Sequence, residues 1–142
     1  MVLIIILLVG AGCIAQEGSS SPFRAGAAPD PESGIVHWID AVNSRNYGSV
    51  YDLMPREKRA GISRNEYILL NRENPSPFLT SGAVIHDYFV LEKRVDGLNA
   101  TVTAGLQTRS PSMEEHAAEK GNTVFFTFDL TFEDNEWKAW VR

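Results

Sequence analysis

Val124-Phe-Phe-Thr-Phe-Asp-Leu-Thr-Phe132 places a large apolar side chain at every second position. Successive side chains of a strand point to opposite faces of a sheet, so this period of two predicts a strand with one face against a core. Phe126, Phe128 and Leu130 then point inward, while Thr127 and Asp129 point outward. The stretch therefore predicts one strand of a sheet that is covered on one side.

A similar alternation occurs in three more segments. Asp96-Gly97-Leu98-Asn99 is typical of a hairpin turn between two of them. On one face of the strand before this turn we expect Ile85, Asp87, Phe89 and Leu91. On one face of the strand after the turn we expect Ala100, Val102, Ala104 and Leu106. A last strand carries Trp137, Ala139 and Val141 inward, which completes a four-stranded antiparallel sheet.

The segment before the strands has helical periodicity. Asp30-Pro31 is typical of a helix start, and the apolar stripe behind it consists of Ile35, Trp38, Ile39 and Val42. Ser49 is expected to cap a short helix before Pro55, and residues 56–60 add one more turn. Ser63 and Glu66 have the spacing of a capping box at the start of another helix. Helices followed by antiparallel strands predict an α+β fold, with the helices packed on one face of the sheet.

Several short stretches carry a resemblance to a known family. They are Trp38 and Ala41, 46–48 leading into 50–53, Ser63-Arg-Asn-Glu-Tyr67, and Glu136-Trp-Lys138. Together they resemble small members of the nuclear-transport-factor-like (cystatin-like) superfamily over residues 35–142. This resemblance implies a strongly curved sheet that wraps around the helices as a cone, with a pocket at its open end. Some families on this fold are isomerases or dehydratases, whereas others only bind ligands or dimerise.

The first fifteen residues predict export. They form an unbroken apolar run that is shorter than the roughly 20 residues of a membrane-spanning helix. Gly10-Ala-Gly12 before Cys13 resembles the lipobox of prokaryotic lipoproteins, which are cut before a cysteine that then carries lipid. We therefore expect a signal peptide over 1–12, a lipidated Cys13 with a flexible tether over 13–33, and one domain over 34–142. Secretion without lipid and an uncleaved anchor are the alternatives.

The charge and composition limit the classes of partner and cofactor that are expected. The formal net charge is −5, which argues against a nucleic-acid partner because such proteins usually present a basic face. His37 and Asp40 lie three residues apart on a predicted helix, but no third ligand has matching spacing, so no metal site is predicted. No cofactor motif is present, and none is expected. The predicted location is the extracytoplasmic face of a membrane, with the chain held by the lipid on Cys13.

Three functions remain open from the sequence. The first is a non-catalytic domain that binds a small apolar ligand or a protein partner, and its expected ligand pocket comprises Trp38, Tyr51, Asp87 and Phe89. The second is an isomerase-like or dehydratase-like enzyme, with Asp87 as general base and Tyr51 or Tyr67 as hydrogen-bond donor. The third is a structural homodimer, whose expected interface on the outer sheet face comprises Phe125, Thr127 and Trp140.

Overall fold

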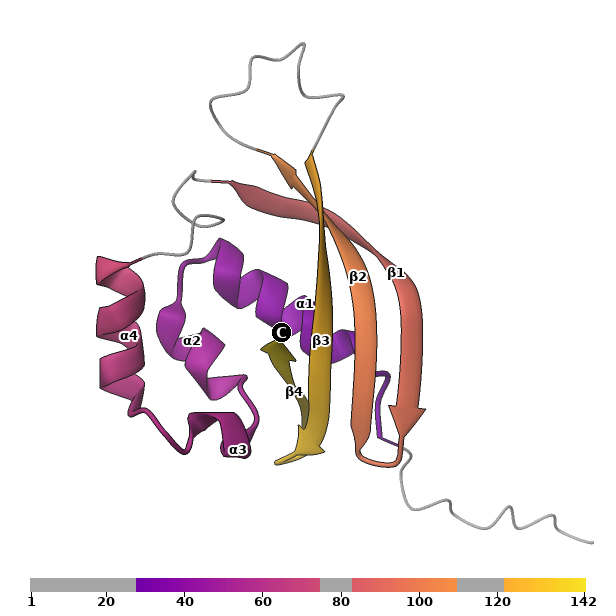
Figure 1. Cartoon of the computed structure of the whole chain (residues 1–142), viewed down its shortest axis with the longest axis horizontal. Coiled ribbons are helices and arrows are strands. Elements are labelled where there is room, and N and C mark those ends of the chain that lie inside the picture. The colour runs from indigo at the N-terminus through magenta and orange to yellow at the C-terminus, as the bar shows by residue number, and fades with distance from the viewer. Residues whose placement is uncertain (1–27, 75–82, 110–121) are drawn as a thin grey trace, which may run out of the picture.

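The computed structural model describes residues 28–74, 83–109 and 122–142. Four helices come first: α1 (Glu32–Asn43), α2 (Tyr47–Asp52), α3 (Arg56–Arg59) and α4 (Arg64–Glu73). Four strands follow: β1 (Val84–Asp96), β2 (Asn99–Arg109), β3 (Asn122–Glu133) and β4 (Glu136–Val141). Each strand pairs antiparallel with the next, and the sheet curves around α1 (Figure 1). The predicted α+β class, with helices on one face of a curved four-stranded sheet, is confirmed.

The core lies between α1 and the inner face of the sheet. The predicted stripe of α1 is buried there, with Trp38 only partly covered. Trp38 meets the ring of Phe128 edge-on at 5.3 Å between centroids. The largest fully buried side chains are Trp137, Phe128, Ile35, Leu106, Leu130 and Val102. The inward residues predicted for β2 and β4, and Phe128 and Leu130 of β3, therefore face this core.

Side chains near the starts of α1 and α4 accept hydrogen bonds from backbone N–H groups of the first turn. Asp30 accepts a hydrogen bond from the backbone N–H of Glu32 at 3.0 Å, and Lys93 of β1 bonds to both carboxylates. These bonds hold the pKa of Asp30 below its ordinary value. Ser63 accepts from the N–H of Glu66, as the capping-box spacing predicts.

The predicted cap of the second helix is wrong. The side chain of Asn46 accepts from the N–H of Ser49 at 3.1 Å, so α2 begins at Tyr47, one turn earlier than expected. An asparagine side chain can satisfy the first free N–H groups of a helix as well as a serine can. The short additional helix expected after Pro55 is present as α3.

Both edges of the sheet carry contacts from the helical layer. On β1, the side-chain amide of Asn43 donates to the carbonyl of Ile85 and accepts from its N–H, at 2.8 and 2.9 Å. On β4, the N–H of Ala139 donates to the carbonyl of Leu53 at 2.7 Å. These contacts attach the end of α1 to the β1 edge and the residue after α2 to the β4 edge.

Two register shifts in β1 correct a prediction of the sequence analysis. They lie between Ile85 and Asp87 and between Val90 and Glu92. Each β-bulge adds one residue to β1, so the alternation of faces reverses after it. Asp87 and Phe89 therefore lie on the outer face and not beside Ile85.

Some of the predicted features lie in residues that the structure does not describe. The signal peptide over 1–12, Cys13 and most of the tether over 13–33 lie outside the described residues. Among the residues that are described, no helix is long and apolar enough to cross a membrane.

Gly34 generates a prediction about how closely α1 approaches the sheet. A Cβ added there would lie 2.9 Å from the Leu130 side chain and 2.9 Å from the Trp137 carbonyl. Replacing glycine by alanine inside a helix normally stabilises by about 1 kcal/mol, but overpacking costs about 1–3 kcal/mol. We expect Gly34→Ala to lower the free energy of unfolding by about 1 kcal/mol, measured by urea denaturation.

The matched control is Gly61→Ala. An added Cβ at Gly61 has no neighbour within 4 Å. The free energy of unfolding of Gly61→Ala should stay within about 0.5 kcal/mol of the wild type or rise slightly above it. Equal stabilisation of both variants would contradict close packing of α1 on β4.

Candidate functional site

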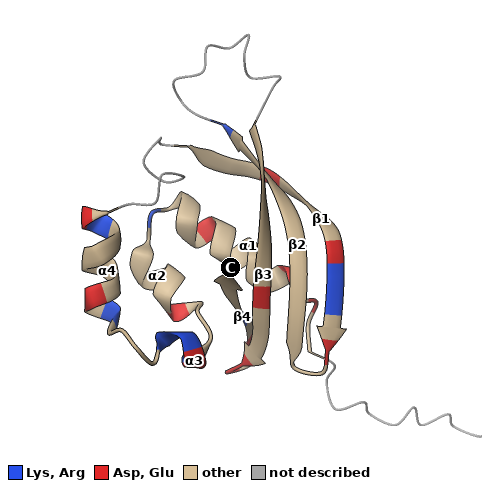
Figure 2. Cartoon of the chain, viewed as in Figure 1, with Lys and Arg blue, Asp and Glu red and all other residues tan. Residues whose placement is uncertain are grey.

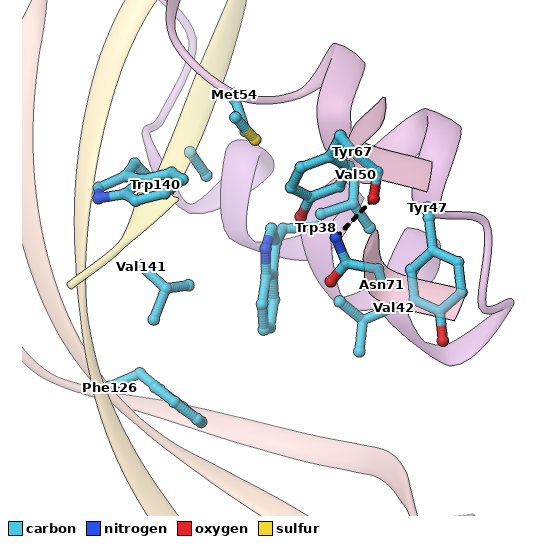
Figure 3. Close-up of a pocket in the computed structure, with 11 residues that line it drawn as sticks. Trp38, Val42, Tyr47, Val50, Met54, Tyr67, Asn71, Phe126, Trp140 and Val141 are labelled. Carbon is cyan, nitrogen blue, oxygen red and sulfur yellow. Dashed lines mark hydrogen bonds between the residues drawn. The ribbon is translucent and has the colours of Figure 1, made fainter. Parts of the chain in front are cut away.

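An apolar pocket of about 250 Å³ lies between the helices and the last two strands (Figure 3). The helices contribute Trp38, Val42, Tyr47, Val50, Tyr67 and Asn71, and Met54 follows α2. The strands contribute Phe126, Ala139, Trp140 and Val141. Aliphatic and aromatic groups dominate this lining, and none of these residues is charged.

The pocket exists because of how the helices are layered. α1 packs on the sheet, α2 packs on α1, and α4 packs chiefly on α2. Figure 1 shows α4 as the outermost helix, separated from β3 and β4 by α2 and α1. Tyr67 of α4 contacts the ring of Tyr51 at 5.6 Å, and Trp38 of α1 contacts that of Phe126 at 6.3 Å. Aromatic rings from the outer helix and from α1 therefore both take part in the walls.

Polar groups are few in this lining, and one of them, the Asn71 amide, is held in place by a hydrogen bond. The side-chain amide of Asn71 donates to the backbone carbonyl of Tyr67 at 2.8 Å, one helical turn earlier. Burial raises the pKa of the Tyr67 phenol above its ordinary value of 10, and the nearby Tyr47 adds a smaller increase. The Tyr67 hydroxyl therefore keeps its proton at neutral pH. The polar groups of the lining are thus the Asn71 amide, the phenol groups of Tyr47 and Tyr67, and the indole N–H groups of the two tryptophans.

Asp87 does not lie in this pocket. It is exposed on the outer side of β1, and its carboxylate accepts from the N–H of Tyr88 at 2.8 Å. The bulge after Ile85 causes this placement, because it turns Asp87 away from the core. A general base for an enclosed substrate would need to face the cavity, with a tyrosine hydroxyl across from it. The geometry required of Asp87 for catalysis is therefore not met.

The other residues predicted for the ligand pocket are divided between different surfaces. Trp38 lines the pocket. Tyr51 donates its hydroxyl to the carbonyl of Ile62 at 2.8 Å and supports the neighbouring Tyr67. Phe89 lies on the outer sheet face, for the same reason as Asp87. Tyr67, predicted as a donor for an enzyme, does line the pocket.

The outer sheet face carries an aromatic row across three strands. Phe89, Gly105 and Phe125 are directly opposite one another in the register of β1, β2 and β3. The rings of Phe89 and Phe125 meet edge-on at 6.3 Å, and a Cβ at Gly105 would lie 2.5 Å from the Phe89 ring. Phe125 is 59% exposed. A glycine between two aromatic residues thus allows one ring to lie across the strand.

The predicted interface residues are arranged around this row. Thr127 pairs with Thr103 on the outer face, where their hydroxyls are 3.3 Å apart. Trp140 is opposite Asp129 in the register, but it also lines the pocket at the edge of the sheet. The exposed rings of this face are those of Phe89 and Phe125, so the predicted interface residue Phe125 lies in the aromatic row, while Trp140 lies on the edge strand.

His37 and Asp40 border a shallow polar groove, together with Asp52 and Glu136. Within the described ranges, no group of three or more histidine, cysteine, aspartate or glutamate side chains could hold a metal ion. The charged residues of both signs are spread over α3, α4 and β1 (Figure 2).

Sequence reasoning missed Asn71, Tyr47 and Val141 as pocket residues. Asn71 follows Tyr67 by four residues, so the helical period alone puts the two on one face of α4. That face could have been identified from this spacing, although α4 is a largely polar helix with no buried residue. Which side of the sheet edge the helix faces is decided by packing on α2, and no local pattern encodes that packing.

No protein-family model and no curated protein matches this chain. Among solved structures, the chain is similar to an LEH-like epoxide hydrolase of M. tuberculosis, with 10% identity and a TM-score of 0.40 over 79% of this chain and 82% of that chain. It is also similar to a protein of Kribbella flavida provisionally described as a ketosteroid isomerase. That likeness has 15% identity and a TM-score of 0.39, over 79% of this chain and 77% of that chain.

Proposed function

We propose that this domain is a non-catalytic binder of a small, largely apolar molecule, which it holds in the pocket between α1, α4 and β4. The observation that carries the proposal is the lining: mostly apolar and aromatic side chains, with one amide, two phenols and two indole N–H groups at separate points. Ligand sites in proteins typically combine an apolar wall with a few placed polar groups. The lining offers no carboxylate, imidazole or amine to move a proton, which favours binding over catalysis.

The pocket volume limits the size of the ligand. A cavity of about 150 Å³ lined by apolar residues holds benzene. A pocket of about 250 Å³ therefore suits a somewhat larger molecule, for which two fused rings are a reasonable probe. Naphthalene fits this description and carries no polar group, so it tests the apolar wall alone.

We also propose that the chain works at the extracytoplasmic face of a membrane, held by lipid on Cys13. The support is the apolar leader, the small residues 10–12 directly before Cys13, and the Gly-, Ser- and Pro-rich stretch that follows. Such a stretch lacks the apolar surface to fold alone and suits a tether. The chain has one cysteine, so Cys13 has no partner for an internal disulfide.

A second candidate function is self-association through the outer sheet face. The Phe89–Gly105–Phe125 row supports it, because exposed apolar groups in register can stack on the same row of a second copy. Nearby charges are paired within the chain: Arg142 bonds to Asp129 at 2.6 Å, and Arg94 lies 4.0 Å from Glu92. Paired charges would not repel a second copy.

The pocket is tested by filling it. Val141→Phe adds a ring to the lining, and Val95→Phe makes the same change at a 51% exposed site away from the pocket. A ligand that binds only the folded state raises the unfolding temperature. Naphthalene should therefore raise the unfolding temperature of the wild type and of Val95→Phe. It should raise the unfolding temperature of Val141→Phe much less. An unshifted wild type would reject the proposed function.

The lipid anchor is tested by intact mass and by labelling with an alkyne fatty acid in a bacterial host. The wild type should lose residues 1–12 and incorporate label, and Cys13→Ser should incorporate none. Ser20→Ala, in the stretch after the cysteine, should behave as the wild type. Retention of Met1 in the wild type without label would contradict the anchor.

Self-association is tested by the mass in solution, measured by sedimentation equilibrium. Phe125→Glu puts a charge in the aromatic row, so it should convert a dimer into a monomer. Leu69→Glu changes an exposed leucine on α4 and should leave the dimer intact. A wild type that is monomeric at high concentration would eliminate this second function.

A further inference from the structure

The orientation of the Asn71 amide is set by its neighbour on the helix. The Tyr67 backbone carbonyl can only accept a hydrogen bond, so the group that faces it at 2.8 Å must be the NH₂ of Asn71. The other amide atom, Oδ1, is then an acceptor with a fixed direction. Figure 3 shows this oxygen directed toward Trp38, which lies in the same pocket.

We propose that the pocket selects uncharged ligands that carry a hydrogen-bond donor, a hydroxyl or N–H on an apolar ring, and that Oδ1 of Asn71 accepts from it. This inference rests on the proposed function of the pocket as a ligand site. Among the hydrogen bonds of the described residues, none is donated to this oxygen. A ligand without a donor would displace water from the oxygen and leave it unpaired, which weakens binding.

The remaining polar groups of the pocket do not require a donor on the ligand, because the indole N–H groups of Trp38 and Trp140 can only donate. A tyrosine hydroxyl both donates and accepts and can rotate, so the Tyr67 hydroxyl can adapt to a ligand donor or to a ligand acceptor. The Asn71 oxygen can only accept. It is therefore the group that separates an alcohol or phenol from the hydrocarbon of the same shape.

Charge is excluded by the same lining. No lysine or arginine lines the pocket, so a carboxylate would lose its hydration without gaining a counter-charge. A bound ammonium group would equally find no carboxylate. The class of ligand is thus a neutral apolar molecule with a hydroxyl or N–H group.

The test compares three probes of one shape by isothermal titration calorimetry on the full chain at pH 7. We expect 2-naphthol to bind about 2- to 10-fold more tightly than naphthalene, the range that one net hydrogen bond provides. We expect the anion 2-naphthoate to bind at least roughly tenfold more weakly than 2-naphthol, because its charge is not compensated.

Two variants on α4 assign the effect to one atom. Asn71→Leu removes the acceptor, so the ratio of the naphthalene and 2-naphthol dissociation constants should fall close to one. Asn74→Leu makes the same change at the exposed end of the same helix and should keep the wild-type ratio.

The outcomes separate this inference from the function on which it rests. Equal affinity of the wild type for naphthalene and 2-naphthol would overturn the selection by Asn71 but leave the pocket as a ligand site. Preference for 2-naphthol that persists in Asn71→Leu would overturn the role of Asn71. Failure of the wild type to bind any of the three probes would overturn both proposals.

Discussion

The contact between α1 and Trp137 of β4 is the constraint on which the rest of the structure depends. Trp137 is 1% exposed, its indole N–H donates to the carbonyl of Pro29, and its ring meets that of Phe132 at 5.4 Å. Gly34 allows the helix to approach this point without a side chain between them. Because α2 packs on α1 and α4 packs chiefly on α2, the position of α1 decides where the outer helix stands. The pocket is the space left between that outer helix and the edge of the sheet, so its shape depends on a contact outside its own walls.

The sequence predicts most of the elements because their signals are local. β2, β3 and β4 pair without a register shift, the apolar stripe of α1 has helical spacing, and Ser63 and Glu66 mark the start of α4. The faces of β1 were predicted wrongly because its two bulges leave no signal in the local sequence. Ile85 to Leu91 alternates plausibly in an unbroken strand, and only pairing with β2 shows that the register shifts twice. The error at Asp87 and Phe89 follows directly, because one inserted residue reverses every later side chain.

The candidate site was predictable only where one residue was distinctive by itself. Trp38 and Tyr67 stand out in their helices, and both line the pocket, although Tyr67 was expected to serve an enzyme. Asn71 and Val141 come from elements far apart in the chain, and their proximity depends on the order in which the helices stack. A pocket assembled across the five elements α1, α2, α4, β3 and β4 is a property of packing, whereas a capping box or a hairpin turn is a property of a few adjacent residues.

The contacts at the two sheet edges have a consequence for aggregation. An open strand edge is a template on which another chain can add a strand, and this is a common route to aggregation. Here the amide of Asn43 occupies backbone groups of β1 at Ile85, and the carbonyl of Leu53 occupies the N–H of Ala139 on β4. The helices thus cover the inner face of the sheet and also bond to backbone groups on both of its edge strands. Loss of α1 and α2 from the sheet would free these backbone groups on both edges, so solubility and helix docking are coupled in this fold.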